Sequence, residues 1–225
     1  MITIALDGPS GAGKSTVCDI VAERLGISHL NTGALYRAIG LYVMQNNIDP
    51  RSKDSVENAL NRIDVDLNFD KGVQRVLLNG TDVTDELYSM AVSDVTSTIS
   101  PYPMVRTYIT GIQRKIAGKY SVIMEGRDIT SEVLPNAKYK FYIDASSDVR
   151  ALRRINDNKN KDNLSLDDFD RIKAEIEERD RRDKTRDISP LVIVPDAVYI
   201  NTDKTTAEEV AEQILDIVRG GECEE

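Results

Sequence analysis

Histidine, cysteine and tryptophan are scarce in this sequence. The 225 residues include one histidine, two cysteines and no tryptophan. Two cysteines, Cys18 and Cys223, are too few for a disulfide framework or a metal site. The single histidine, His29, lies beside a predicted strand, where a structural role is more common than a catalytic one. The small disulfide-stabilised class is therefore excluded, and histidine chemistry is not expected.

Long apolar runs are also missing. No stretch approaches the ~20 apolar residues that a membrane-spanning helix needs, and no basic segment followed by an apolar one marks a signal peptide near Met1. Lys and Arg number 29 against 38 Asp and Glu, a net charge of −9. This balance argues against a nucleic-acid-binding surface. We expect a cytoplasmic protein that binds neither nucleic acid nor membrane.

What the sequence does contain is a phosphate-binding motif near its start. Residues 8–16 fit the pattern Gly-x4-Gly-Lys-[Ser/Thr]. The apolar stretch Ile2–Asp7 before them predicts a buried parallel strand. The stretch Thr16–Leu25 has its apolar residues on one helical face and is followed by Gly26. The motif thus has the strand–loop–helix context that it requires. We assign nucleoside-triphosphate binding to Gly8, Pro9, Ser10, Gly11, Ala12, Gly13, Lys14, Ser15 and Thr16.

Each part of this loop has a physical role. The glycines allow backbone angles and a close approach that a Cβ would prevent, so that successive N–H groups can face phosphate oxygens. The following helix adds its unpaired N–H groups and its positive dipole end. Lys14 supplies a mobile charge for the β- and γ-phosphates, and the hydroxyl of Ser15 is placed to bind Mg²⁺.

Strand-like and helix-like stretches alternate through the rest of the chain, which predicts a three-layer α/β P-loop NTPase fold with a parallel sheet. A helix that carries Arg150, Arg153 and Arg154 follows one of these strands. Thr32 is the expected N-cap of the helix that begins near Ala34. The other strands are expected near 27–31, 121–124, 138–144 and 197–201, and the other helices near 34–44, 105–118, 166–185 and 205–219.

One stretch does not fit this alternation. Residues 65–69 and 73–79 alternate between apolar and polar around a turn at 70–72, which predicts a β-hairpin. A doubly wound sheet does not need such a hairpin. We therefore predict that residues 46–96 form a small inserted domain over the active-site edge of the sheet, and that residues 1–45 and 97–225 form the core.

Ligands of open α/β sheets lie beyond the carboxyl ends of the strands. Three clusters of charged and hydroxyl residues are candidates for a site there: Thr32 with Arg37, Glu125 with Arg127 and Asp128, and Arg179 with Asp183 and Arg186. The third set is spaced i, i+4, i+7 and so shares one helical face. The same spacing is equally typical of a solvated ladder of surface ion pairs.

Taken together, these stretches resemble the bacterial-type cytidylate kinases. The matching segments, spread over nearly the whole chain, are residues 8–14, 32–37, 126–128, 144–147, 178–180, 189–191 and 195–197. The resemblance implies a P-loop kinase that transfers the γ-phosphoryl group of ATP to CMP or dCMP with Mg²⁺. The hairpin insertion would be the enlarged monophosphate-binding domain of that family. We expect a monomer.

The resemblance also implies roles for single residues. Those that would contact the monophosphate are Thr32, Arg37, Ser97, Arg106, Arg127, Asp128, Arg179, Asp183 and Arg186. The phosphate would be held by Arg37 and Arg127, the sugar by Asp183, and cytosine by Ser97, Arg106 and Asp128. Residues 150–163 would form a lid whose Arg150 and Arg154 contact ATP. The catalytic residues would be Lys14, Arg127 and Arg179.

Three positions depart from the family pattern. Asn31 stands where Asp is usual, and Thr130 stands where Gly is usual. Glu125 stands where Asp is frequent, and it keeps the charge, so that a role near Mg²⁺ through water remains available to it. The Asn31 and Thr130 changes leave the local loop geometry open.

The chemistry of the residues agrees with this class. A hydroxyl acceptor needs a base to take its proton, whereas a nucleotide phosphate is largely dianionic at neutral pH. The sequence offers no obvious base but many arginines, which suit two mutually repelling anions and the transferred phosphoryl group. Catalysis would then be positioning, screening and exclusion of water.

Two alternatives stay open at this point. The first is another small-molecule P-loop kinase, acting on AMP, UMP or a hydroxyl acceptor, which a panel of acceptors would identify. The second is a nucleotide-dependent switch. Guanine-reading switches use Asn-Lys-x-Asp after a strand, and the nearest match here, within residues 158–162, fails that spacing.

Overall fold

Two compact units make up the chain. The computed structural model describes residues 1–70, 73–158 and 166–222. Unit 1 consists of residues 1–2 and 26–122, and unit 2 consists of residues 3–25 and 123–225. The predicted insertion, residues 46–96, falls entirely within unit 1, whereas the phosphate-binding motif belongs to unit 2.

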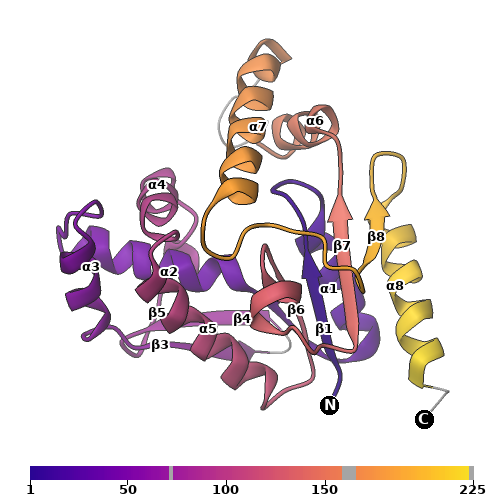
Figure 1. Ribbon diagram of the computed structural model, residues 1–225, viewed down its shortest axis with the longest axis horizontal. Coiled ribbons are helices and arrows are strands. Elements are labelled where there is room, and N and C mark those ends of the chain that lie inside the picture. The colour runs from indigo at the N-terminus through magenta and orange to yellow at the C-terminus, as the bar shows by residue number, and fades with distance from the viewer. Residues whose placement is uncertain (71–72, 159–165, 223–225) are drawn as a thin grey trace. The chain divides into compact units, whose positions relative to one another are not determined.

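Unit 2 contains the parallel strands and the helices that follow them (Figure 1). Its elements are β1 (Thr3–Asp7), α1 (Lys14–Leu25), β6 (Val122–Gly126), the short helical turn η2 (Ile129–Val133), β7 (Tyr139–Asp144), α6 (Ser147–Asn158), the turn η3 (Leu166–Asp168), α7 (Phe169–Thr185), β8 (Val198–Asn201) and α8 (Ala207–Glu222). The strands of unit 2 lie in the order β6-β1-β7-β8 in their sheet.

The sheet is parallel where β1, β7 and β8 pair. Ile4 is opposite Tyr139, and Phe141 is opposite Val198. β1 is buried on both faces, as expected of a strand inside a parallel sheet, and even the carboxylate of Asp7 at its end is inaccessible. The predicted α/β class with a parallel sheet is therefore confirmed.

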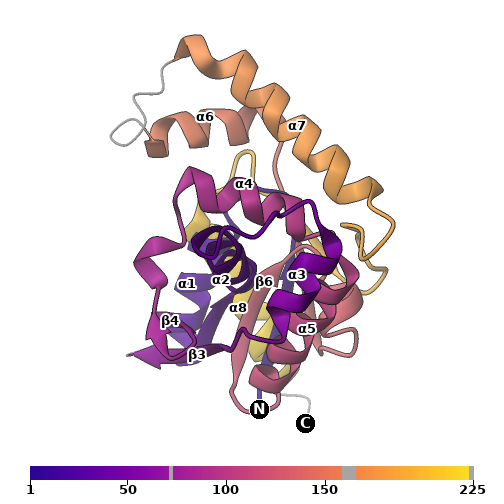
Figure 2. The ribbon, with the colours of Figure 1, turned by 90° about the vertical axis from the view of Figure 1, so that its left-hand side faces the viewer.

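The helices of unit 2 form two packed pairs. α1 and α8 pack against each other, and Arg24 on α1 forms ion pairs with Glu208 and Glu212 on α8. α6 and α7 lie side by side in both ribbon views (Figures 1 and 2) and share a small apolar core that includes Ile155 and Ile172. The second pair places the charged face of α7 beside the phosphate-binding motif.

Unit 1 combines helices with a small antiparallel sheet. Its elements are β2 (Ser28–Asn31), α2 (Thr32–Gln45), α3 (Lys53–Leu60), β3 (Val65–Asp70), β4 (Val73–Leu78), β5 (Thr81–Asp82), the turn η1 (Thr84–Glu86), α4 (Met90–Ile99) and α5 (Pro103–Ala117). Its core is formed by α2, α4, α5 and one face of the hairpin.

The hairpin follows from its alternating pattern. β3 and β4 pair with Val65 opposite Leu78 and Leu67 opposite Val76. Val65, Val76 and Leu78 are buried in the core of unit 1. Residues 71 and 72 of the predicted turn lie outside the described residues. The β-hairpin itself is confirmed, and β5 adds a short third strand to it.

Some local predictions need correction. α2 begins at Thr32, so the residue at the N-cap is Asn31 rather than Thr32. α3 and α4 were not predicted, because short helices of mixed polar and apolar residues carry only a weak periodic signal. Their N-caps, Ser52 and Ser89, accept hydrogen bonds from residues three positions later and mark both starts. In the described part of the chain, no helix has the length and apolarity to cross a membrane.

Gly40 allows α2 and α4 to pack closely, which yields a stability prediction. A Cβ at Gly40 would lie 2.3 Å from Oγ1 of Thr96 and 3.3 Å from its backbone nitrogen. Oγ1 cannot rotate away without losing its 2.7 Å bond to the carbonyl oxygen of Val92. We expect Gly40→Ala to lower the free energy of unfolding by about 1–3 kcal/mol, measured by urea denaturation.

The matched control is Gly111 on α5. It is an exposed glycine in a helix interior, where a Cβ would meet nothing within 4 Å. Gly111→Ala should raise the free energy of unfolding by about 0.5–1 kcal/mol through helix propensity alone. Equal shifts of the same sign in both variants would contradict the packing argument.

Candidate active site

The phosphate-binding loop connects β1 to α1 and begins at Gly8. Gly8 has a φ of +150°, and a Cβ there would lie 1.9 Å from the carbonyl oxygen of Ile143 on β7. No side chain can be accommodated against a neighbouring strand backbone at that distance. The first glycine of the motif is therefore required by packing within the sheet as well as by its φ angle.

Lys14, the first residue of α1, is almost completely buried. Its Nζ donates a hydrogen bond to the carbonyl oxygen of Pro9 at 2.7 Å. Burial, followed by the positive charge of Arg127, lowers the pKa of Lys14 to about 7. The carboxylates of Glu125 and Asp7 act in the opposite direction. A bound polyphosphate would add strong negative charge here and favour the protonated lysine.

Two further carbonyl groups of the loop are bound from outside it. Nη1 of Arg150 donates to the carbonyl oxygen of Ser10 at 3.2 Å. The carbonyl oxygen of Ala12 accepts bonds from Nη1 of Arg153 at 3.3 Å and from Oγ1 of Thr202 at 3.1 Å. Because the C=O and N–H of a trans peptide point in opposite directions, these bonds aim the N–H groups of the same peptides away from their partners. The N–H donors are thereby kept available for an anion.

Asp7 connects the end of β1 to the turn after β6. Its carboxylate accepts hydrogen bonds from the N–H of Ile129 at 2.9 Å, the N–H of Thr130 at 2.8 Å and Oγ1 of Thr130 at 2.6 Å. Burial raises the pKa of Asp7, and the bonds from Thr130 and Ile129 oppose that shift. Thr130, which departs from the family pattern, thus has a defined role, since its hydroxyl helps to fix the turn that follows Arg127 and Asp128.

Arg127, Asp183 and Arg186 form an ion-pair cluster. Nε of Arg127 donates to Oδ2 of Asp183 at 3.0 Å, and Nη1 of Arg186 lies 3.8 Å from Oδ1 of the same carboxylate. All three side chains are less than one-fifth exposed. Arg181 and Glu178 form an exposed ion pair of the kind found in a solvated surface ladder. The cluster of Arg127, Asp183 and Arg186 is not of that kind, because its side chains are mostly buried.

In unit 1, Arg37 lies over the first turn of its own helix, α2. A Cβ at Gly33 would lie 3.3 Å from Nη1 of Arg37, and the neighbouring Thr32 is buried. The guanidinium carbon of Arg37 is 5.2 Å from the ring centroid of Tyr88. A helix N-terminus beside a guanidinium group is a favourable place for a phosphate.

The hairpin supports this turn through Gln74 on β4. Oε1 of Gln74 accepts the N–H of Asn31 at 2.8 Å, and its Nε2 donates to the carbonyl oxygen of Asn31 at 3.3 Å. The side chain of Asn31 makes no capping hydrogen bond to α2. The backbone at this departure from the family pattern is therefore held by the hairpin.

The other two candidates of unit 1 lie on different helices. Arg106 on α5 is 5% exposed, and its Nη1 donates to the carbonyl oxygen of Ser100 at 3.3 Å. Its guanidinium carbon is 5.7 Å from the ring centroid of Tyr36. Ser97 on α4 is exposed. The remaining predicted monophosphate contacts belong to unit 2: Arg127, Asp128, Arg179, Asp183 and Arg186.

The arginines predicted to contact ATP occupy different surroundings. Arg150 is buried among protein groups, whereas Arg154 is exposed and lies 4.0 Å from Glu175. Arg179 on α7 is exposed as well. The first part of the predicted lid belongs to α6, and residues 159–163 lie outside the described residues.

Ser15 and Glu125, the two residues predicted to contact magnesium, carry the oxygen groups that Mg²⁺ prefers. Ser15 is exposed in the first turn of α1, and Glu125 is buried at the end of β6, close enough to raise the pKa of Lys14. Among the described residues, no group of three or more His, Cys, Asp or Glu could hold a metal by itself. Mg²⁺ in kinases keeps several waters and uses one or two protein ligands plus substrate phosphates.

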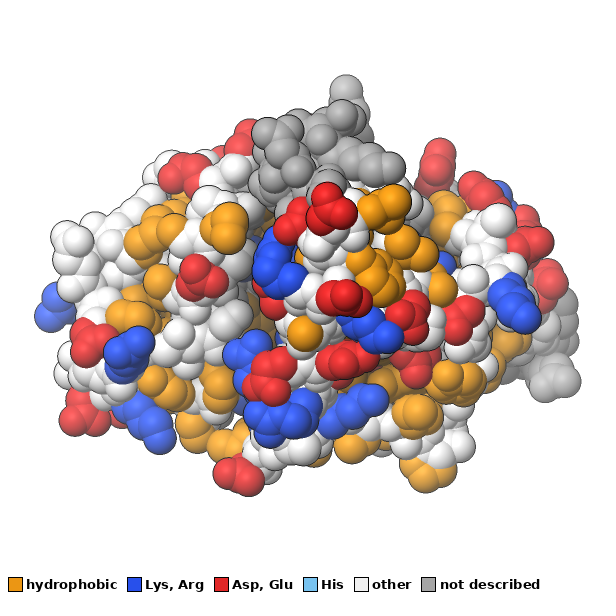
Figure 3. Space-filling view, turned by 90° about the horizontal axis from the view of Figure 1, so that it is seen from above, with side chains coloured by type: hydrophobic (Ala, Val, Ile, Leu, Met, Phe, Trp, Pro, Cys, Tyr) orange, Lys and Arg blue, Asp and Glu red, His pale blue; other side chains and the backbone are white. Residues whose placement is uncertain are grey.

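Charges of both signs are interspersed on the surface. In Figure 3, Lys and Arg side chains lie among Asp and Glu side chains across the middle of the face. Ion pairs near the surface include that of Lys173 with Asp148 at 2.7 Å. Positive charge is thus used in local pairs, although the net charge is −9.

Three residues that organise the loops were not predicted as site residues. They are Asp7, Arg153 and Asp180, the last of which accepts hydrogen bonds from Arg150. Each lies within or directly beside a segment that the sequence singled out. Asp7 precedes the motif, Arg153 stands between the two arginines predicted to contact ATP, and Asp180 follows Arg179. Adjacency to a motif was the available signal, but it does not reveal which side chain faces the loop.

Comparisons with known proteins cover nearly the whole chain. A family model described as cytidylate kinase matches residues 4–220. The chain is 40% identical over 217 residues to a cytidylate kinase of Caldicellulosiruptor bescii, covering 96% of this chain and 95% of that protein. It is 40% identical over 216 residues to a cytidylate kinase of Fervidobacterium nodosum, with the same coverage.

A solved structure of an uncharacterised protein from Eubacterium ventriosum has a similar fold. Its TM-score is 0.53 at 14% sequence identity, and the alignment covers 97% of this chain and 99% of that one. At this identity, the likeness concerns the fold alone.

The Asp7–Thr130 contact yields a prediction about stability. Thr130→Val removes the hydroxyl donor but keeps the branched shape, so a buried carboxylate loses one of its three bonds. We expect the free energy of unfolding in urea to fall by about 1–3 kcal/mol. Thr130→Ser keeps the donor and should lose no more than about 0.8 kcal/mol, the value of one methyl-sized group. A valine variant as stable as the serine variant would contradict the role given to the hydroxyl.

Proposed function

The chain belongs to the cytidylate kinase family, and on that premise we propose that it transfers the γ-phosphoryl group of ATP to CMP or dCMP. The products would be ADP and CDP or dCDP. The chain is an ATP-dependent nucleoside monophosphate kinase. A monomer in the cytoplasm, without a nucleic-acid partner, is part of the same proposal.

The observation that carries this proposal is the presence in unit 2 of two sets of groups whose chemistry suits anions. The loop that ends at Lys14 suits a polyphosphate donor. The cluster of Arg127, Asp183 and Arg186 suits a second anion, because guanidinium groups bind phosphate oxygens in pairs. A nucleotide-dependent switch would have no use for the second set.

Each set would have a distinct task. In the first, the loop amides and Lys14 would hold the β- and γ-phosphates, and Arg150 and Arg154 would lie on the lid side of ATP. In the second, Arg127 would hold the monophosphate and Asp183 the sugar. The family resemblance adds Arg37 of unit 1 as a further contact of the phosphate. Arg179 would stabilise the transferred group. Cytosine would be bound by Ser97, Arg106 and Asp128.

The reaction needs no general base on the protein. The acceptor is a phosphate that is largely dianionic at neutral pH, so that its oxygen can attack the γ-phosphorus in line while ADP leaves. The arginines and Lys14 would offset the repulsion between the two anions and the charge that spreads over the transferred group. A kinase with a hydroxyl acceptor would instead need a positioned base.

Ser15 and Glu125 are the proposed magnesium contacts, Ser15 directly and Glu125 through water. When bound, Mg²⁺ would bridge and neutralise phosphate oxygens. The protein's contribution is the exposed hydroxyl at the start of α1 and a buried carboxylate at the end of β6.

The insertion at residues 46–96 and the lid at residues 150–163 would move over the substrates. Closure would exclude water, which would otherwise accept the phosphoryl group. Gln74 connects the insertion to the turn before Thr32. Movement of the hairpin would therefore shift the backbone at Asn31, next to Thr32 of the proposed monophosphate site. Both boundaries are proposals.

An acceptor panel with ATP tests the proposed function directly. A pocket that pairs charged groups with cytosine leaves them unpaired when the wrong base binds, which costs a few kcal/mol. We expect kcat/KM for CMP or dCMP to exceed that for AMP or GMP at least about a hundredfold, with UMP poor but detectable. Equal use of AMP and CMP would contradict the assignment. Transfer only to hydroxyl acceptors would show that the protein is instead a P-loop kinase with a hydroxyl acceptor.

Arg106 provides a test inside the pocket. Because Arg106 is buried and is proposed to face the acceptors of cytosine, Arg106→Ala should raise KM for CMP by about tenfold or more and leave KM for ATP within about twofold. Arg114 on the same helix is exposed, and Arg114→Ala serves as the matched control with both constants unchanged. A defect confined to ATP would exclude the proposed role of Arg106.

A further inference from the structure

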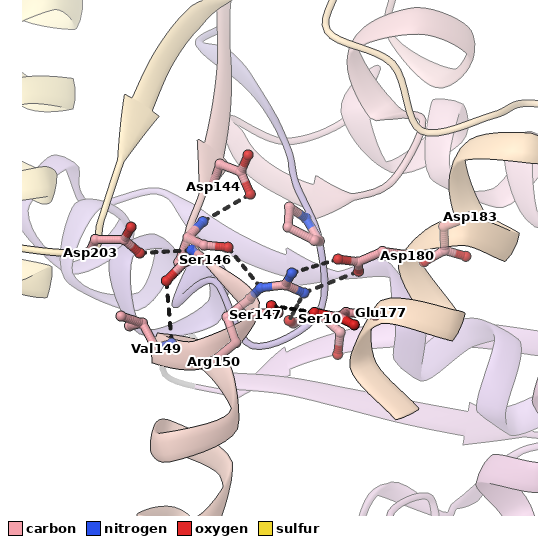
Figure 4. A network of polar contacts seen from close by, with 12 residues as sticks. Ser10, Asp144, Ser146, Ser147, Val149, Arg150, Glu177, Asp180, Asp183 and Asp203 are labelled. Carbon is pink, nitrogen blue, oxygen red and sulfur yellow. Dashed lines mark hydrogen bonds and ion pairs between the residues drawn. The ribbon is translucent and has the colours of Figure 1, made fainter. Parts of the chain in front are cut away.

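Arg150 makes four hydrogen bonds to protein groups, and its predicted contact with ATP does not explain them. Its Nε donates to the carbonyl oxygen of Ala145 at 2.8 Å, and its Nη1 donates to the carbonyl oxygen of Ser10 at 3.2 Å. Nη1 and Nη2 also donate to Oδ1 and Oδ2 of Asp180 at 3.1 and 2.5 Å. These four bonds use four of the five N–H groups of a guanidinium. Figure 4 shows Arg150 between Ser10 and Asp180.

The Arg150–Asp180 pair is buried. The side chain of Arg150 is 5% exposed and that of Asp180 is 13% exposed. A buried ion pair contributes little net stability unless its remaining N–H groups and oxygens have hydrogen-bond partners. Here the carbonyl oxygens of Ala145 and Ser10 accept hydrogen bonds from the guanidinium of Arg150. The fixed, planar guanidinium joins three segments in one geometry: the phosphate-binding loop, the β7–α6 turn and α7.

α7 carries residues of the proposed site close to this pair. Arg179 precedes Asp180, and Asp183 lies one turn later, where it accepts the 3.0 Å bond from Arg127. Displacement of α7 at Asp180 would therefore displace the arginine cluster as well. Nη1 of Arg150, which also donates to Asp180, holds the Ser10 carbonyl, which aims the N–H of Gly11 in the opposite direction.

We propose that Arg150 and Asp180 are positioning residues that set the arginine-bearing face of α7 at a fixed place relative to the phosphate-binding loop. Arg150 acts through the Ser10 carbonyl and Asp180, and ATP phosphates are held by the loop itself. The inference rests on the proposed function for its kinetic readout. It assigns to Arg150 a task other than the ATP contact implied by the family resemblance.

The chain contains a matched control for this pair. Ser147 and Glu177 also join α6 to α7, through a bond of 2.7 Å from Oγ to Oε1, and each lies three positions before its counterpart in the Arg150–Asp180 pair. The Ser147–Glu177 contact is exposed, and Figure 4 shows both contacts side by side. Only the Arg150–Asp180 pair includes a bond to the phosphate-binding loop.

The experiment compares wild type, Asp180→Asn, Arg150→Lys, the double variant and Glu177→Gln. Asp180→Asn keeps the shape of the side chain but removes its charge and one of the two oxygens that accept hydrogen bonds from the guanidinium of Arg150. Arg150→Lys keeps the charge, but an ammonium group lacks the planar fork that reaches a carbonyl and both carboxylate oxygens together. Thermal unfolding confirms that each variant is folded at the assay temperature, and kcat and KM are measured for CMP and for ATP.

We expect Asp180→Asn and Arg150→Lys each to lower kcat by about tenfold to a hundredfold, the effect of a small misplacement of reacting groups. KM for ATP in Asp180→Asn should stay within about threefold, because the loop amides and Lys14 are unchanged. The double variant should have a kcat no lower than that of the less active single variant, since the two residues act as a unit. Glu177→Gln should keep kcat within about twofold.

A second readout does not depend on turnover. Binding of a non-hydrolysable ATP analogue should slow amide hydrogen exchange in residues 176–185 of α7 in wild type and in Glu177→Gln, but not in Asp180→Asn. This loss of coupling would separate positioning from general packing of α6 on α7.

Several outcomes would overturn the inference. These are equal kcat values for Asp180→Asn and Glu177→Gln, a defect in Asp180→Asn that appears only in KM for ATP, or protection of α7 that persists in Asp180→Asn. If wild type does not phosphorylate CMP, the proposed function fails, whereas hydrogen exchange still decides whether the pair couples the loop to α7.

Discussion

The orientation of the peptide groups between Gly8 and Lys14 is the constraint on which unit 2 depends. An anion can be held by backbone N–H groups only if the carbonyls of the same peptides are satisfied elsewhere. The carbonyl oxygens of Pro9, Ser10 and Ala12 are bound by Lys14, by Arg150, and by Arg153 with Thr202. The donors come from the start of α1, from α6 and from the residue after β8, so that the shape of the loop depends on distant parts of the unit.

Buried charge is the second common feature of this unit. Lys14, Asp7, Glu125, Asp128 and Arg150 are all less than one-tenth exposed. Burial penalises each charged form, and the arrangement compensates locally: Asp7 receives three hydrogen bonds, and Arg150 makes four. The pKa of Lys14 is lowered to about 7, and the negative charge of a bound polyphosphate would stabilise its protonated form. Two of these five groups are cations, so a protein of net charge −9 still places buried positive charge where phosphates are expected.

Unit 1 solves a related problem with a different element. The turn between β2 and α2 has no side-chain cap from Asn31, and Gln74 of the hairpin holds its backbone instead. The hairpin is therefore part of the structure around Thr32 and Arg37, in addition to covering the apolar side of unit 1. In the same unit, the buried Arg106 lies over the ring of Tyr36, an attractive contact between a cation and an aromatic face.

The sequence by itself determined the phosphate-binding loop, the alternation of strands and helices and the hairpin, because each of these is encoded in local spacing and periodicity. Its matching segments also carried the resemblance to the family. It could not decide which of Arg150, Arg153 and Arg154 meets the loop, since all three lie on one short helix. That choice depends on partners such as Ser10, which is 140 positions from Arg150. Thr130 was visible only as a departure from a pattern, and its bond to Asp7 spans 123 positions. Side-chain pairing of this kind exists only after the strands have placed distant loops at one edge of the sheet, and so the tertiary structure alone decided it.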